Sequence, residues 1–225
     1  MNELHLFAGC GGGILGGILC GHTTVCAVEI EPYRRATLLQ RQRDGVLPRF
    51  PIWDDVQTFD GRPWRGIVDV VSGGFPCQAF STAAAGRNNA DDLWPEMRRI
   101  VADVAPWYVF AENVSRDAIN QAADDLEAMG YQVRCLELSA QDMGADHIRG
   151  RCWLLAHTDM HSELRSAIDA EVACLPGIRP RVWEAFADES RMDDGLAYRL
   201  DRLKATGNGQ IPIVAATAWR MLGGV

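Results

Sequence analysis

The sequence predicts an α/β fold, in which a mostly parallel sheet is covered by helices on both faces. Over the first 157 residues, apolar runs typical of buried strands alternate with stretches of helical periodicity. A glycine-rich loop follows the first predicted strand and opens a helix. Polar residues that could carry chemistry come directly after strands, and this is the edge at which open α/β sheets bind ligands.

The predicted elements follow from short apolar runs and from helical spacing, taken in chain order. Strands are expected at residues 3–7, 24–30, 68–71, 107–111, 131–138 and 152–156. Helices are expected from about residue 14, and at 32–42, 91–104 and 116–129. Pro32 suits the first turn of its helix because proline fixes φ and needs no hydrogen-bond partner there. A last apolar helix is predicted at 211–222.

The pattern divides the chain into three parts. Residues 1–157 form the α/β domain. Residues 158–202 are polar, contain Pro176, Gly177 and Pro180, and have few apolar positions, so we expect an arm rather than a second domain with its own core. Residues 203–225 contain a Gly-Asn-Gly turn and the last helix, which we expect to return to the first domain.

Composition bounds the class of protein. With 225 residues, 48% hydrophobic and 23% charged, the chain is long enough for one domain with a sizeable core. Its longest uncharged apolar run, residues 14–20, is too short to cross a membrane, and no basic leader is seen at the start. Seven cysteines without a CxxC pattern or metal-ligand spacing indicate reduced thiols, and hence a cytoplasmic protein. The five histidines suggest no metal site either.

The charge pattern leaves nucleic acid open as a partner. The formal net charge of −8 argues against a protein held to DNA by bulk electrostatics. However, Lys204 is the only lysine among 22 basic residues, and the rest are arginines. Arginine can bind phosphate or guanine edges with two parallel hydrogen bonds.

The glycine loop FAGCGGG at residues 7–13 indicates a nucleoside cofactor. Glycines let a ligand approach the backbone, and the amides at a helix start can bind its polar end. Glu29 closes the second predicted strand, where an acid can accept hydrogen bonds from ribose hydroxyls. The alternative is an ordinary glycine-rich turn between a strand and a helix.

Two further segments place reactive residues after strands. Cys77, in GGFPCQAFS, could act as a thiolate nucleophile, although a buried core thiol is the alternative. Glu112 and Asn113 follow the apolar run of residues 107–111. They could direct a carboxyl group at the same cleft, or simply cap the helix that follows.

These segments resemble the DNA (cytosine-5)-methyltransferases. The stretches FAGCGGG, VEIEPY, GGFPCQAFS, ENV, HIRGR and TGNGQIP occur in the order of that family. The residues found in the stretches PIWDDV, GGFPCQ, HIRGR and RLKATGN resemble those of the phage and prophage branch of this family. The resemblance implies a class I S-adenosylmethionine-dependent methyltransferase fold. It also implies double-stranded DNA as the partner, in the cytoplasm of a bacterial host cell.

The resemblance also assigns residues. Those matching the S-adenosylmethionine site are Phe7, Gly9, Gly11, Glu29, Ile30, Asp55, Val56, Pro76, Leu93, Asn208 and Gly209. The catalytic set comprises Cys77, Glu112, Arg149 and Arg151, with Gln78, Ser81 and Asn113 against the substrate. In this family, a thiolate adds to carbon 6 of a flipped-out cytosine while the acid holds ring nitrogen 3, and carbon 5 is methylated.

Three departures from the family pattern stand out, and one of them is a loop after Cys77 and Gln78 that is shorter than usual. His147 stands where the family usually has glutamine. Residues 158–202 replace a far longer target-recognition domain, so we expect a short or relaxed sequence context. Two other functions stay open: a cofactor-binding subunit that needs a partner for recognition, and a cytosine-5 RNA methyltransferase. Gln78 favours DNA over RNA.

Overall fold

In the computed structural model, residues 1–76, 92–158 and 209–224 are described. The predictions for Cys77, Gln78, Ser81 and Asn208, and for most of the arm at 158–202, fall outside these residues. The extents of the three predicted parts of the chain therefore stay predictions.

The described residues form one seven-stranded sheet, with the strand order β3-β2-β1-β4-β5-β7-β6. The strands are β1 (Asn2–Leu6), β2 (Thr23–Val28), β3 (Ile52–Trp53), β4 (Val70–Gly74), β5 (Tyr108–Asn113), β6 (Gln132–Leu138) and β7 (Arg151–His157). Strands β1 to β5 pair in parallel, whereas β7 runs antiparallel between β5 and β6. The prediction of a mostly parallel sheet is confirmed.

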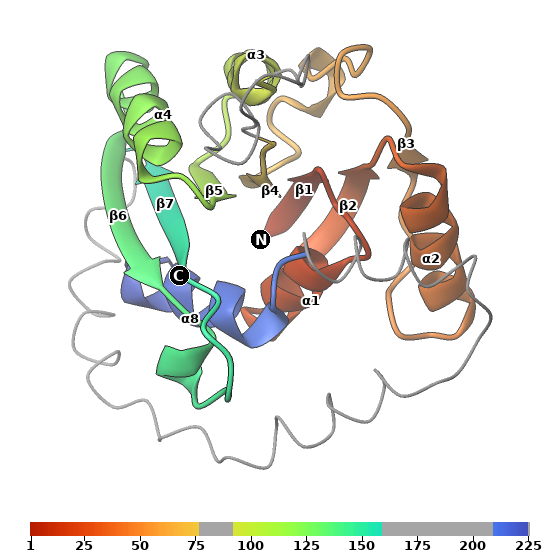
Figure 1. Cartoon of the computed structure of the whole chain (residues 1–225). Coiled ribbons are helices and arrows are strands. Elements are labelled where there is room, and N and C mark those ends of the chain that lie inside the picture. The colour runs from red at the N-terminus through yellow and green to blue at the C-terminus, as the bar shows by residue number, and fades with distance from the viewer. Residues whose placement is uncertain (77–91, 159–208, 225) are drawn as a thin grey trace, which may run out of the picture.

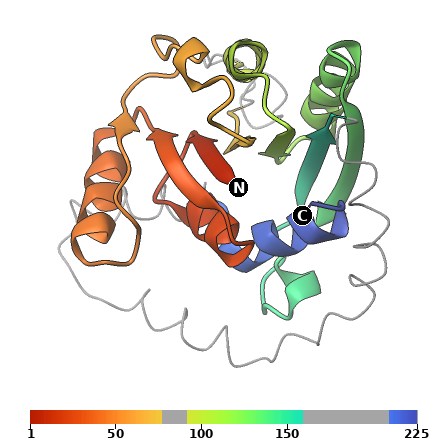
Figure 2. The ribbon, with the colours of Figure 1, turned by 180° about the vertical axis from the view of Figure 1, so that it is seen from behind.

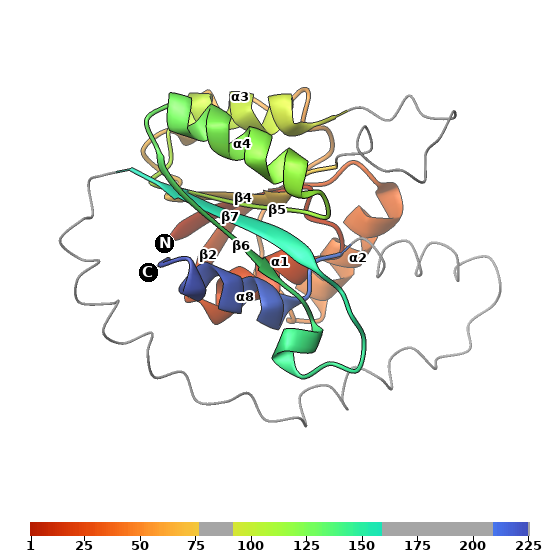
Figure 3. The ribbon, with the colours of Figure 1, turned by 60° about the vertical axis from the view of Figure 1, so that its left-hand side comes forward.

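Helices cover both faces of this sheet (Figure 3), as predicted. Helices α3 (Trp94–Val104) and α4 (Arg116–Ala128) lie on one face. On the other face lie α1 (Gly12–Leu19), α2 (Pro32–Arg43) and α8 (Pro212–Met221). Figures 1 and 2 both show α8 beside α1, so the end of the chain returns to its beginning.

The core consists of two layers divided by the sheet. Alternate side chains of a strand point to opposite faces, so Leu4 and Leu6 of β1 pack in the cluster under α3 and α4. Phe110 of β5 faces the other way, against Trp153 and Trp219. The sheet edge at which β1, β2, β4 and β5 end is thereby held rigid from both sides.

The predicted elements are all present within the described residues, but some bounds differ. The strand predicted at 68–71 runs instead from Val70 to Gly74, because Ser72 and Gly73 are buried between two neighbouring strands. The two-residue strand β3 was not predicted. Neither were two short 3₁₀ helices, Arg62–Trp64 and Gln141–Met143.

Candidate active site at the carboxyl edge of the sheet

The glycine loop between β1 and α1 is built from left-handed backbone. Phe7, Gly9 and Gly11 have φ values of 52°, 56° and 90°. Gly11 is the N-cap of α1, where the amides of the first turn are free of intrahelical partners. A Cβ built on Gly9 would have no atom of the described residues within 4 Å, so among these residues the backbone there borders space that a ligand could enter.

Glu29 lies beside this loop, at the end of β2. Its carboxylate is buried and accepts two backbone hydrogen bonds, from Gly9 N at 2.6 Å and Glu31 N at 2.9 Å. Arg35 of α2 donates to the carbonyls of Glu29 and Ile30 and so fixes the backbone behind the acid. The Ile30 side chain is 63% exposed, which leaves an apolar surface next to Glu29.

Four more predicted cofactor residues surround this edge. Asp55 follows β3, which pairs with β2, and its carboxylate accepts from the Gln57 amide at 2.9 Å. Val56 is buried in the core. Leu93, the N-cap of α3, donates its backbone N–H to the Pro76 carbonyl at 3.3 Å. The position before Cys77 is therefore tied to the start of α3.

Glu112 is the central residue of the second half of this sheet edge, where β4 and β5 end. It is 6% exposed, lies at the end of β5, and pairs in register with Gly74 of β4. Its Oε1 accepts from Arg151 Nε at 2.8 Å. This contact follows from pairing, because Glu112 lies opposite Trp153, and Arg151 two residues earlier on β7 faces the same side.

The polar residues Asn113 and Ser115 complete the part of the sheet edge around Glu112. Asn113 donates from Nδ2 to the Phe75 carbonyl at 2.9 Å, and its Oδ1 accepts from the Ser115 amide. Ser115 is the residue that caps α4, by accepting from Ala118 N at 3.3 Å. Glu112 is therefore not the helix cap that the sequence left open as an alternative.

Arg149 reaches the C-terminal part of the chain. Its Nη2 donates to the Gly209 carbonyl at 2.6 Å, which brings the turn before α8 to the site. Burial and the charge of Arg151 lower the pKa of Arg149. Burial raises the pKa of Glu112, while Arg151, Gln210 and Arg149 all favour its ionised form and oppose that rise.

Sequence reasoning missed Gln210. Its Nε2 donates to Glu112 Oε2 at 3.4 Å, on the oxygen that Arg151 does not hold. The signal was present, since Gln210 belongs to the TGNGQIP stretch and directly follows a predicted site residue. His147, at the family's usual glutamine position, is exposed beside Asp146.

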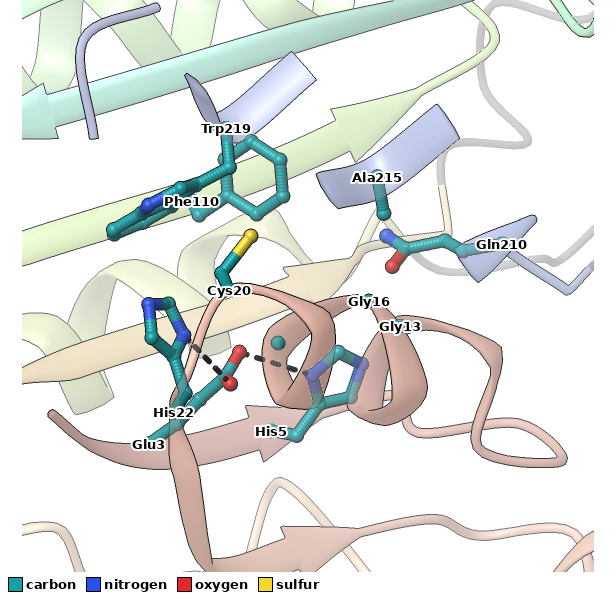
Figure 4. Close-up of a pocket in the computed structure, with 11 residues that line it drawn as sticks. Glu3, His5, Gly13, Gly16, Cys20, His22, Phe110, Gln210, Ala215 and Trp219 are labelled. Carbon is teal, nitrogen blue, oxygen red and sulfur yellow. Dashed lines mark hydrogen bonds and ion pairs between the residues drawn. The ribbon is translucent and has the colours of Figure 1, made fainter. Parts of the chain in front are cut away.

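Behind the site lies a buried polar pocket between α1, α8 and β1 (Figure 4). Glu3 of β1 accepts a hydrogen bond from His22 Nδ1 at 3.1 Å and lies 3.6 Å from His5 Nδ1. The Ser72 hydroxyl also donates to Glu3. Gln210 lines the same pocket, so the pocket and the site share one side chain.

Two kinds of feature are absent from the part of the chain that the structure describes. No group of three His, Cys, Asp or Glu side chains among them could hold a metal ion. None of their helices is long and apolar enough to cross a membrane.

The strand order, the single antiparallel strand and the resemblance to solved structures define the class I S-adenosylmethionine-dependent methyltransferase fold. Residues 1–201 match the model of the family described as C-5 cytosine-specific DNA methylase. The chain belongs to this family.

Two curated relatives of the chain are described as type II methyltransferases. The chain is 34% identical over 176 residues to the type II methyltransferase M1.HphI of Haemophilus parahaemolyticus, which covers 71% of the chain and 46% of the relative. It is 32% identical over 163 residues to M.NgoMIV of Neisseria gonorrhoeae, covering 68% and 51%. The chain therefore spans about half the length of these curated relatives.

Solved structures agree on the fold. A DNA modification methyltransferase encoded within an E. coli prophage is similar at a TM-score of 0.58 and 25% identity, over 70% of this chain and 47% of that one. The Dnmt2 methyltransferase of S. pombe is similar at a TM-score of 0.56 and 21% identity, over 72% and 52%. At that identity the second likeness concerns the fold alone.

Proposed function

We propose that this protein transfers a methyl group from S-adenosylmethionine to carbon 5 of cytosine in double-stranded DNA. Family membership supports the reaction class. The observation that carries the proposal for this chain is the ion pair between the buried Glu112 and the partly buried Arg151. It lies at the end of β5, in register with the end of β4, which leads through Pro76 to Cys77.

The cofactor would bind at the other half of the edge. Glu29 and the open backbone at Gly9 fit a ribose and its neighbouring chain, and the exposed Ile30 offers an apolar contact beside them. We propose binding roles for the predicted set of Phe7, Gly9, Gly11, Glu29, Ile30, Asp55, Val56, Pro76, Leu93, Asn208 and Gly209. When bound, S-adenosylmethionine supplies an electrophilic methyl group.

The protein's own groups would activate the cytosine. The Cys77 thiolate adds to carbon 6, and Glu112 gives a proton to ring nitrogen 3, so that carbon 5 becomes nucleophilic. After methylation, a base such as water or hydroxide removes the carbon 5 proton, and the bond between sulfur and carbon 6 breaks. Because stacking covers the ring face in a duplex, the base must be flipped out.

Arg151 has two roles in this proposal. Its Nε holds Glu112 in place, and its charge partly offsets the cost of burying the carboxylate. Gln78, Ser81 and Asn113 are proposed to contact the substrate, and Arg149 to hold the turn at Gly209 in place.

We further propose a short or relaxed sequence context, and a phage-like origin in a bacterial cytoplasm. Few arginines or aromatic residues in 158–202 could enter a DNA groove, and base readout needs such side chains. A requirement for four or more flanking bases, found by sequencing the methylated DNA, would contradict the relaxed context.

The deciding experiment is nucleoside mass spectrometry of unmethylated duplex DNA after incubation with the protein and S-adenosylmethionine. Cys77→Ala is run in parallel, together with an RNA substrate. We expect 5-methylcytosine in DNA with the natural protein only. Product with Cys77→Ala would remove the proposed nucleophile, and product in RNA alone would overturn the choice of substrate.

A second candidate is a cofactor-binding subunit that depends on a partner for DNA recognition. The observations that favour it are the short segment at residues 158–202 and the formal net charge of −8, which offer few side chains and little positive charge for DNA binding. In that case the protein would bind S-adenosylmethionine but methylate DNA only when host lysate is added. Gel filtration with labelled DNA, with and without lysate, separates the two cases.

A further inference from the structure

Gln210 reaches Glu112 from a segment far away in sequence. It precedes Ile211, the N-cap of α8, and follows Gly209, which Arg149 holds by its carbonyl. From there its side chain extends into the space between α1 and β4, beside Ala215 and Gly13 (Figure 4). Its Nε2 then lies 3.4 Å from Glu112 Oε2.

Three glycines leave room for the backbone and side chain of Gln210 and for the Glu112 carboxylate. A Cβ on Gly12 would overlap the backbone oxygen of Gln210, and one on Gly13 would overlap its side-chain oxygen. A Cβ on Gly74 would lie 2.6 Å from Glu112 Oε2 and 3.2 Å from Gln210 Nε2. Gly12 and Gly13 belong to the glycine loop, so part of that loop serves Gln210 as well as the cofactor.

The two ends of the Gln210 amide have different surroundings. The N–H end points at a carboxylate oxygen. Among the described residues, the buried Oε1 end has no hydrogen-bond partner. An amide N–H donated to a carboxylate favours the ionised form of the acid. Glu112 is thus held on both oxygens, by Arg151 on Oε1 and by Gln210 on Oε2.

We propose that Gln210 is a positioning residue, which fixes the Glu112 carboxyl group against Arg151 and favours its ionised form. The inference deepens the proposed function, and its importance for catalysis rests on that function. Glu112 must hold a proton for ring nitrogen 3 and yet give it up readily. Burial alone makes the proton hard to lose, and Gln210 opposes this effect.

The test uses replacements of the same length. Gln210→Met keeps the shape and removes the donor, and Gln210→Glu replaces the donor with a negative charge. The titration of Glu112 is followed by ¹³C NMR of the side-chain carboxyl groups, assigned with Glu112→Gln. Gln42→Met is the matched control, because Gln42 also donates from Nε2, at 3.0 Å to the Phe50 carbonyl, but from α2.

We expect the Glu112 titration midpoint to rise by roughly half to one pH unit in Gln210→Met, and further in Gln210→Glu. Gln42→Met should leave it unchanged. In the natural protein the rate of single-turnover methyl transfer should fall at high pH as Glu112 loses its proton. That fall should move to higher pH in the same order, with S-adenosylmethionine affinity changed less than twofold.

An unchanged Glu112 midpoint in Gln210→Met would overturn the inference, whatever Gln210→Glu does, because the added carboxyl group repels Glu112 by itself. So would a shift of equal size in Gln42→Met. If the natural protein methylates nothing, the proposed function fails, but the NMR titration still decides whether Gln210 controls Glu112. Should Gln210→Met not fold, Gln210→Leu, which also removes the donor without adding a charge, takes its place.

Discussion

Glu29 and Glu112 are both buried carboxylates at strand ends, yet the protein holds them in different ways. Glu29 accepts hydrogen bonds from the backbone amides of Gly9 and Glu31, and Arg34 of α2 adds only a longer ion pair, with Nη1 3.7 Å from Glu29 Oε1. Glu112 is held by the side chains of Arg151 and Gln210, the second of them 98 residues away. The hydrogen bonds to Glu29 therefore come from backbone amides, and those to Glu112 come from side chains.

The difference indicates different tasks. Backbone amides are permanent donors, and they suit an acid whose task is to accept hydrogen bonds from hydroxyl groups. Side-chain partners can tune how tightly an acid holds its proton. Burial raises the pKa of Glu112, and the two side chains counter it, which suits a group that exchanges a proton during a reaction.

The strongest test of this contrast is Glu112→Gln. We expect the single-turnover rate of methyl transfer to fall by roughly 10² to 10⁴, because a general acid is lost. S-adenosylmethionine affinity, measured by calorimetry, should stay within about twofold. Glu137→Gln is the control, since the Arg116–Glu137 pair is also close, at 2.6 Å, but exposed. An equal loss in the control would refute a specific role.

Glu3 is a third buried carboxylate to compare with Glu29 and Glu112. Its partners are side chains, but it lies within β1 and not at the sheet edge where the site is. Burial raises its pKa, but the hydrogen bonds and charges of His22 and His5 outweigh burial and lower it to about 2. The stability that this provides is complete above about pH 4.5 and is lost as the pH falls toward 2.

Glu3→Gln should therefore destabilise the fold at pH 7 by on the order of 3 kcal/mol. The difference from the natural protein should shrink through the same pH window and vanish near pH 2. Urea unfolding at a series of pH values measures it. A deficit that is constant with pH would mean that packing, and not the charge of Glu3, provides the stability.

The same contrast explains what could be predicted from the sequence. The strands and the long helices were predictable because their apolar spacing is local. Glu29 and Glu112 were predictable because each directly follows an apolar run. β3 was not, since Ile52 and Trp53 are too short a run to show a period.

Features that depend on contacts between distant parts of the chain could not be predicted from local sequence patterns. The insertion of β7 between β5 and β6 depends on which strands pair, and no local spacing encodes that choice. The contact of Gln210 with Glu112 depends on the path of α8 back to α1. Arg151 was found only through the resemblance of HIRGR to a family motif.

A smaller effect is expected from glycine replacements. They separate two contributions to the free energy of unfolding: strain in the backbone and disturbed side-chain packing. Gly13→Ala puts a methyl group into the space of Gln210 Oε1 and the His5 ring. We expect a loss of about 1–3 kcal/mol in unfolding free energy, together with a shifted Glu112 titration. The control is Gly21→Ala, where φ is 81° and a Cβ would have no atom of the described residues within 4 Å. That change should cost about 1 kcal/mol through the backbone alone and leave Glu112 unchanged.

The smallest effect concerns the cofactor half. In Glu29→Gln the amide oxygen can accept from only one of the two backbone amides, and its NH₂ group then faces the other N–H. We expect S-adenosylmethionine to bind roughly tenfold more weakly, the equivalent of one hydrogen bond to a charged group. The rate of methyl transfer at saturating cofactor should stay nearly constant, because Glu29 does not contact the base in this proposal.

Calorimetry measures the cofactor affinity, and single-turnover assays at saturating cofactor measure the rate, with the exposed Glu31→Gln as control. If Glu29→Gln lowered the saturated rate as far as Glu112→Gln does, the division of the strand ends into a cofactor half and a base half would be wrong.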